Sequence, residues 1–189
     1  HVLVRHEQAA GFIAQGIART TGLPAVCIAT SGPGATNLVT GIATAYMDSV
    51  PMVAITANVP DTLIGRDAFQ EIYITGITMP ITKHNFFVNK VEDLANILRE
   101  AFCISQSGRK GPVLVDITKD VTAAVTEYTP EQPYPLKELP KAEEAELKQV
   151  AEVINHANAP VIYCGGGAAF RQVEQELHAL MEKADISWV

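Results

Sequence analysis

Basic residues are too few in this sequence for a nucleic-acid-binding surface. The 189 residues contain 14 lysines and arginines against 21 aspartates and glutamates, a net charge of −7 at pH 7. No run of basic residues occurs, and no apolar stretch is long enough to span a bilayer. We therefore expect neither nucleic acid nor a membrane among the partners of this protein.

Cysteine is also scarce. Cys27, Cys103 and Cys164 are an odd number of cysteines, are widely spaced, and each lies in an apolar segment. This pattern favours reduced, buried thiols over disulfides. Internal repeats and low-complexity tracts are lacking too, and the 48% hydrophobic and 19% charged composition is ordinary for a globular protein.

The most informative stretch is a glycine-containing turn between a predicted strand and a predicted helix. Residues 25–29 form a short apolar run without alternation, which is typical of a strand covered on both faces. Gly32 and Gly34 flank Pro33, so the backbone can turn sharply with no side chain between it and a ligand. The helix that follows would add free N–H groups at its start. The alternative is a tight turn that only connects strand and helix.

Two charged residues lie where strands are predicted to end. Glu7 follows a predicted strand at residues 1–5, and Lys119 follows a buried strand at residues 113–117. Ligands of open α/β sheets bind outside the carboxyl ends of the strands, so both residues are candidates for a site. The alternatives are a glutamate that stabilises a helix N-terminus and a solvated lysine.

The remaining segments predict a polar loop, a linker and a second α/β unit. Phe69 and Gln70 close the polar loop, residues 60–70, either as site residues or as part of a surface loop that folds back. Four prolines and several charges in residues 128–140 are typical of an interdomain linker. Beyond it, helix and strand patterns surround a glycine turn at residues 165–167, which alone is a weak signal of nucleotide binding.

Both ends of the sequence fall within predicted strands, at residues 1–5 and 186–189. A domain seldom begins and ends inside a sheet element, so we expect this chain to be part of a longer one. No signal peptide is visible in the sequence.

Several segments resemble one family, the catalytic large subunits of acetolactate synthase (acetohydroxyacid synthase), within the thiamine-diphosphate enzyme superfamily. The segments that carry the resemblance are residues 5–10, 29–37, 45–51, 67–71 and 111–120. Together they extend the resemblance over most of residues 1–125, and more loosely through residues 165–167. The glutamate and the Gly-Pro-Gly turn alone would indicate only the superfamily, whereas residues 69–71 and 119–120 favour this member.

The resemblance implies an α/β fold with a parallel sheet flanked by helices. Residues 1–125 would form the pyrimidine-binding domain without its first elements, and residues 126–140 would be a linker. Residues 141–189 would begin a Rossmann-like FAD-binding domain. The Gly-Asp-Gly…Asn motif that holds magnesium in this family does not occur in the sequence. The resemblance therefore assigns no metal ligand here, and Mg²⁺ would bind through a domain absent from this chain.

The resemblance also implies a reaction and partners. The family decarboxylates pyruvate and condenses the two-carbon unit with pyruvate or 2-ketobutyrate, in the synthesis of isoleucine and valine. The large subunits form homodimers or tetramers and pair with a regulatory small subunit, in the cytoplasm or in an organelle. We expect the 189-residue chain alone to be inactive.

Residue roles follow from the same resemblance. The catalytic residues would be Glu7, Gln70 and Lys119. Thiamine diphosphate would contact Glu7, Gly32, Pro33, Gly34 and Asn37. The substrate channel would contain Phe69, Gln70 and Lys119. FAD would contact Arg109, Gly165, Gly166 and Gly167.

Two departures from the family pattern lie in the polar loop and just after it: Arg66 stands where a smaller residue is usual, and Ile72-Tyr73 replaces a small-then-acidic pair. They leave the preferred second 2-keto acid open. The alternatives are a related carboligase or pyruvate oxidase, or a non-catalytic chain that pairs with a partner.

Overall fold

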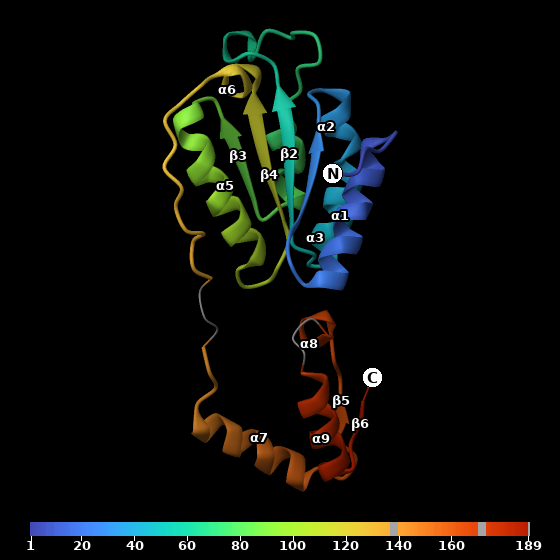
Figure 1. Ribbon diagram of the computed structural model, residues 1–189. Coiled ribbons are helices and arrows are strands. Elements are labelled where there is room, and N and C mark those ends of the chain that lie inside the picture. The colour runs from blue at the N-terminus through green and yellow to red at the C-terminus, as the bar shows by residue number, and fades with distance from the viewer. Residues whose placement is uncertain (137–139, 170–172, 189) are drawn as a thin grey trace. The chain divides into compact units, whose positions relative to one another are not determined.

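The chain contains two compact units, His1–Lys137 and Glu138–Val189 (Figure 1). The computed structural model describes residues 1–136, 140–169 and 173–188. Each unit combines helices with a parallel sheet, of four strands in the first and two in the second. The α/β class predicted from the sequence is confirmed.

The sheet of the first unit has the strand order β1-β2-β4-β3, and all neighbours are parallel. Its strands are β1 (Ala25–Ala29), β2 (Met52–Asn58), β3 (His84–Val88) and β4 (Pro112–Thr118). Thr56 pairs with Ala29 on one side and with Asp116 on the other. The carboxyl ends of the strands therefore lie together at one edge, the upper one in Figure 1.

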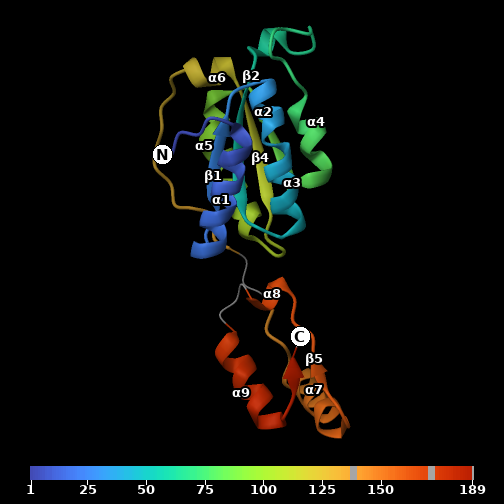
Figure 2. The ribbon, with the colours of Figure 1, turned by 90° about the vertical axis from the view of Figure 1, so that its right-hand side faces the viewer.

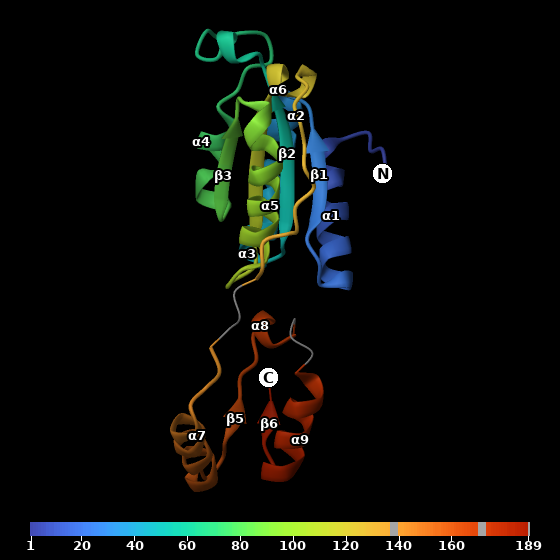
Figure 3. The same cartoon turned by 60° about the vertical axis from the view of Figure 1, so that its left-hand side comes forward.

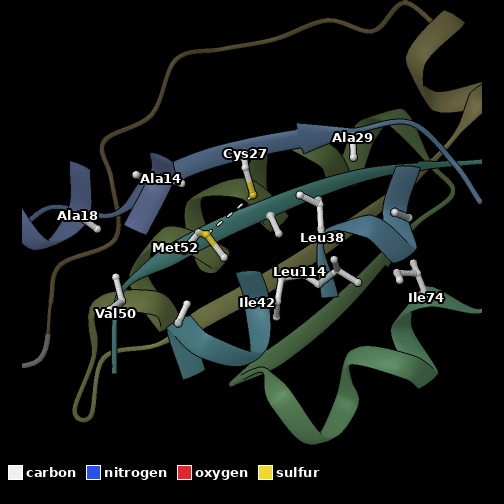
Figure 4. Close-up of a cluster of buried hydrophobic side chains, with 14 residues drawn as sticks. Ala14, Ala18, Cys27, Ala29, Leu38, Ile42, Val50, Met52, Ile74 and Leu114 are labelled. Carbon is white, nitrogen blue, oxygen red and sulfur yellow. Dashed lines mark hydrogen bonds between the residues drawn. The ribbon is translucent and has the colours of Figure 1, made fainter. Parts of the chain in front are cut away.

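Helices cover both faces of this sheet. They are α1 (Glu7–Thr21), α2 (Pro33–Asn37), α3 (Val39–Met47), α4 (Ile74–Thr78), α5 (Val91–Gln106) and α6 (Lys119–Ala123), with short 3-10 helices at Asp61–Leu63 and Met79–Ile81. Helices α1, α3 and α4 lie on one face (Figure 2) and α5 on the other (Figure 3). The first face buries Leu38, Ile42 and Leu114 (Figure 4), and the second buries Val53, Val113 and Val115.

Strand β1 is covered on one face only. Ala25, Cys27 and Ala29 are buried against the first face, whereas Val26 and Ile28 are 42% and 68% exposed. The prediction of a strand covered on both faces was wrong, because α5 packs against β2, β3 and β4 and leaves the outer strand uncovered.

Helix α1 packs very closely against α3. A Cβ built on Gly11 would lie 3.2 Å from Cα of Gly41, so the two backbones are in contact. The side-chain amide of Gln15, which is buried, donates to the carbonyl of Gly41 at 2.9 Å. These contacts fix the position of α1, and with it Glu7 at the start of the helix.

The predicted strand at the start of the chain was also wrong. Residues 1–4 form no strand, and Val2 and Leu3 are 73% and 92% exposed, because they form no ladder with β1.

The second unit is small, and most of its described side chains are exposed. Its elements are α7 (Glu144–His156), β5 (Val161–Ile162), α8 (Gly166–Ala169), α9 (Glu174–Ala184) and β6 (Ser187–Trp188). Strands β5 and β6 are parallel, and residue 189, in the predicted last strand, lies outside the described residues. Across both units, no described helix is long and apolar enough to cross a membrane.

The three cysteines are free in this structure. Cys27 is buried, and burial raises the pKa of its thiol to about 12. Cys103 and Cys164 are only partly buried. The prediction of reduced thiols holds for all three, and that of burial for Cys27 alone.

Candidate cofactor and substrate site

Glu7 begins helix α1 beside the carboxyl edge of the sheet. Its Oε2 accepts a hydrogen bond from Nδ2 of Asn37 at 2.9 Å. That hydrogen bond holds the pKa of the Glu7 carboxyl below its ordinary value, so the group is an anion and a strong acceptor at neutral pH. Glu7 is partly exposed, and a ligand at this edge can therefore reach it.

The Gly-Pro-Gly turn lies against this carboxylate. A Cβ on Gly34 would come within 2.7 Å of Cγ2 of Thr30 and 3.4 Å of Oε1 of Glu7. Only glycine fits there without displacing Thr30. The turn therefore packs its backbone tightly between the side chains of Thr30 and Glu7.

The polar loop packs onto the same turn. Gly32 has φ of +60°, and a Cβ there would lie 2.7 Å from the carbonyl oxygen of Gln70. Gln70 itself has φ of +61°, a left-handed conformation that is uncommon for a residue with a side chain. The structure therefore brings Gln70, a predicted substrate residue, into contact with the predicted cofactor turn.

Glu71 shapes the end of this loop. Its carboxylate accepts hydrogen bonds from the backbone N–H groups of Gly65 and of Ala68, the latter at 2.8 Å. These bonds hold the pKa of Glu71 below its ordinary value. The closed turn leaves the ring of Phe69 89% exposed, so that ring is available to a ligand or to another chain.

Lys119 is the first residue of α6 and follows β4 directly. Its side chain is exposed at the carboxyl edge. The next residue, Asp120, accepts a hydrogen bond from the backbone N–H of Asp61 at 2.5 Å. Lys119 and the polar loop are therefore attached to the same strand end.

Arg109 does not join this group. It lies in the turn between α5 and β4, at the opposite edge of the sheet from the candidate site. Its Nε donates to Oγ of Ser49 at 2.7 Å, and its Nη2 donates to the carbonyls of Tyr46 and Met47. Arg109 thus ties two turns together at the amino ends of the strands.

The glycine turn at residues 165–167 belongs to the second unit. A Cβ on any of its three glycines would meet no atom of the described residues within 4 Å. Gly165 and Gly166 line a cavity of about 440 Å³ together with Cys164, Leu177 and Met181. Within the described ranges, no group of three or more His, Cys, Asp or Glu residues is placed to hold a metal ion.

Comparison with known proteins agrees with this geometry. Residues 1–77 match the N-terminal TPP binding domain of thiamine pyrophosphate enzymes. Over 98% of its length the chain is 51% identical to the acetolactate synthase isozyme 1 large subunit of Escherichia coli (strain K12). By this match, residues 1–77 belong to the N-terminal TPP binding domain family of thiamine pyrophosphate enzymes.

Two other relatives are also acetolactate synthases. The chain is 48% identical to an acetolactate synthase of Arthrospira platensis and 49% identical to acetolactate synthase 2, chloroplastic, of Nicotiana tabacum, in each case over 98% of its length. It covers 33% of the bacterial proteins from Escherichia coli and Arthrospira, and 28% of the tobacco protein. The chain therefore spans about a third of the length of these relatives.

The chain also contains a buried polar group that the sequence analysis did not predict. Asp116 in β4 is 1% exposed, and its two carboxylate oxygens accept hydrogen bonds from Thr56 at 2.7 Å and Asn58 at 2.6 Å. Burial raises the pKa of Asp116 to about 6. Asp116 and Asn58 line a cavity of about 420 Å³ with Glu71 and Tyr73. In the sequence, the only sign of this buried group was an aspartate within the apolar run 113–117.

Proposed function

We propose that this chain forms the aminopyrimidine side of the thiamine diphosphate site of an acetolactate synthase large subunit. One observation carries the proposal: the Glu7 carboxylate, partly exposed, accepts a hydrogen bond from Asn37 beside the Gly34 turn, at the carboxyl edge of a parallel sheet. The names of the relatives support the choice of reaction.

The described residues fit this cofactor. Oε2 of Glu7 accepts from Asn37, while Oε1 lies beside the Gly34 turn, and Glu7 is partly exposed, so a ring at this edge could reach its carboxylate. A carboxylate in that position would accept a hydrogen bond from N1′–H of the aminopyrimidine and so favour a proton at that nitrogen. Thiamine diphosphate, when bound, supplies the nucleophilic carbon and the electron sink for decarboxylation of a 2-keto acid.

The substrate side of the proposed site consists of Gln70, Phe69 and Lys119. The ammonium of Lys119 would attract the carboxylate of a 2-keto acid. Phe69 and Gln70 would limit the space beside the turn, since the Gln70 backbone already touches Gly32. We propose pyruvate as the first substrate, and pyruvate or 2-ketobutyrate as the second, in the synthesis of branched-chain amino acids.

We further propose that residues 1–125 are the pyrimidine domain, residues 126–140 a linker and residues 141–189 the start of an FAD-binding domain. The open backbone at Gly165, Gly166 and Gly167 would admit the FAD diphosphate. Arg109 is an exposed residue whose guanidinium donates to Ser49 and to two backbone carbonyls, and we propose that it also contacts FAD. Flavin absorbance of the purified protein tests this part.

The remaining proposals concern partners and compartment. The 189-residue chain alone would hold half a site and be inactive, with Mg²⁺ bound through the part of the relatives that it does not cover. Copies would assemble as dimers or tetramers with a regulatory small subunit, in the cytoplasm or in an organelle. Sedimentation of the intact enzyme, with and without a small subunit, tests the assembly.

A hybrid protein tests the proposed reaction. The segment of the Escherichia coli isozyme 1 large subunit that aligns with this chain would be replaced by residues 1–189, since 51% of the aligned residues are identical. We expect the hybrid to form acetolactate from pyruvate, and its Glu7→Gln variant to lose about 10²- to 10⁴-fold in rate. The unaltered large subunit and its matching Glu→Gln variant are the controls.

The outcomes separate the alternatives. A folded hybrid that binds thiamine diphosphate but makes no acetolactate would refute the proposed reaction, and oxygen uptake with pyruvate would indicate an oxidase instead. Equal activity of the hybrid and its Glu7→Gln variant would refute the role of Glu7.

A further inference from the structure

Two consecutive hydrogen bonds connect β4 to the start of the loop that carries Gln70. Oδ2 of Asp116 accepts from Nδ2 of Asn58 at 2.6 Å, and Oδ1 of Asn58 accepts from the backbone N–H of Val59 at 2.8 Å. Asp116, Asn58 and Val59 are 1%, 8% and 7% exposed. These nearly buried bonds connect residue 116 to the first residue of the loop, and removing the Asn58 amide would take a partner from both Asp116 and the N–H of Val59.

A further hydrogen bond connects the end of β4 to the same loop. The backbone N–H of Asp61 donates to Asp120, the residue after Lys119. At its far end the loop rests on Gly32 through the backbone of Gln70. One strand end therefore carries Lys119 and also fixes the start of the segment that carries Gln70.

We infer that Asp116 and Asn58 are positioning residues, which set where Gln70 lies relative to Lys119. They act through the backbone of Val59, and among the described residues neither is hydrogen-bonded to the side chain of Gln70 or Lys119. The inference rests on the proposed function for the roles of Gln70 and Lys119. The loop geometry itself does not depend on that function.

Thr56 provides a matched control. Its hydroxyl donates to the other oxygen of Asp116, Oδ1, at 2.7 Å, and among the described residues this hydroxyl makes no hydrogen bond to the loop. Thr56→Val therefore removes a bond to the same carboxylate without touching the connection through Asn58.

Asp116→Asn provides a second control. The new amide oxygen would accept from Asn58, and the new NH₂ would donate to the hydroxyl oxygen of Thr56, which can accept. The connection from residue 116 to Val59 survives this change but is lost in Asn58→Ala.

Amide hydrogen exchange on the 189-residue chain tests the positioning directly, without cofactor or activity. In Asn58→Ala we expect the amides of residues 59–71 to exchange at least about tenfold faster, while β2 residues 52–56 keep their protection. Thr56→Val and Asp116→Asn should leave the exchange of residues 59–71 unchanged. Unchanged loop exchange in Asn58→Ala would overturn the inference. So would equal acceleration in Thr56→Val, or loss of protection throughout the sheet in a folded Asn58→Ala variant.

Kinetics of the hybrid enzyme supply the second readout. Asn58→Ala should lower kcat/KM for pyruvate about tenfold while the Kd for thiamine diphosphate stays within about twofold. A loss confined to cofactor affinity would overturn the inference. An inactive parent hybrid would refute the proposed function alone, because the exchange experiment still decides the role of Asn58.

Discussion

Replacing Asp116 by asparagine should make the folded chain more stable at neutral pH, although this side chain is buried and accepts two hydrogen bonds. Burial raises the pKa of the Asp116 carboxyl from 3.8 to about 6. Below pH 3.8 the carboxyl is protonated in both the folded and the unfolded chain, so it costs nothing. Between the two pKa values only the unfolded chain ionises, and stability falls as the pH rises. Above pH 6 both states are ionised and the full cost remains.

The size of this cost follows from the pKa difference. A shift of about 2 units corresponds to about 3 kcal/mol of unfolding free energy at pH 7, and the same relation leaves about 0.5 kcal/mol at pH 4. Asparagine resembles the protonated carboxyl and keeps both hydrogen bonds. The stability difference between the Asp116→Asn variant and the parent chain should therefore grow from about 0.5 kcal/mol at pH 4 to about 3 kcal/mol at pH 7.

Urea denaturation of both chains at pH 4, 5, 6 and 7 measures this difference. All other titrating groups are common to the two chains, so their contributions cancel. A difference that does not change with pH, or a variant that is less stable than the parent at pH 7, would refute the argument that Asp116 is ionised in the folded chain at a cost.

Three other predictions concern single side chains. Thr118→Val should stabilise the chain by about 1 kcal/mol in urea denaturation, because the buried Thr118 hydroxyl has no hydrogen-bond partner among the described residues. The control Thr56→Val, which removes a hydrogen bond to Asp116, should destabilise the chain by about 2 kcal/mol. Gly34→Ala should weaken thiamine diphosphate binding to the hybrid by more than about tenfold in a calorimetric titration, because its Cβ would lie 2.7 Å from Thr30; unchanged affinity would show that the turn does not contact the cofactor. Lys119→Ala in the hybrid should raise KM for pyruvate about tenfold and leave cofactor affinity unchanged, and the reverse pattern would place Lys119 on the cofactor side.

The part of the candidate site that lies within short stretches of sequence could be predicted. Gly34 and Asn37 follow strand β1, and Glu7 begins the helix α1 that leads back to the amino end of the same strand, so the three residues lie at one edge of the sheet. The parallel α/β class follows from the same alternation of strands and helices.

The contacts between strands could not be predicted. Asp116 meets Thr56 and Asn58 only because β4 pairs with β2 in one register, which no local pattern reveals. The exposure of Ile28 depends in the same way on which strands α5 covers. The predicted strand at residues 1–5 was wrong because a strand needs a partner, and residues 1–4 have none in the described sheet.

The backbone contact between Gly11 and Gly41 limits which sequences this site tolerates. A methyl group at Gly11 would lie 3.2 Å from Cα of Gly41, so α1 would have to move outward by a few tenths of an ångström. Gly11 is about one helical turn from Glu7, and a stiff helix passes such a shift on to its first residue. Alanine at Gly11 would therefore alter the distance between Glu7 and Asn37 without touching either side chain. Small substitutions at this helix crossing would thus change the hydrogen-bond distance between Glu7 and Asn37 in small steps.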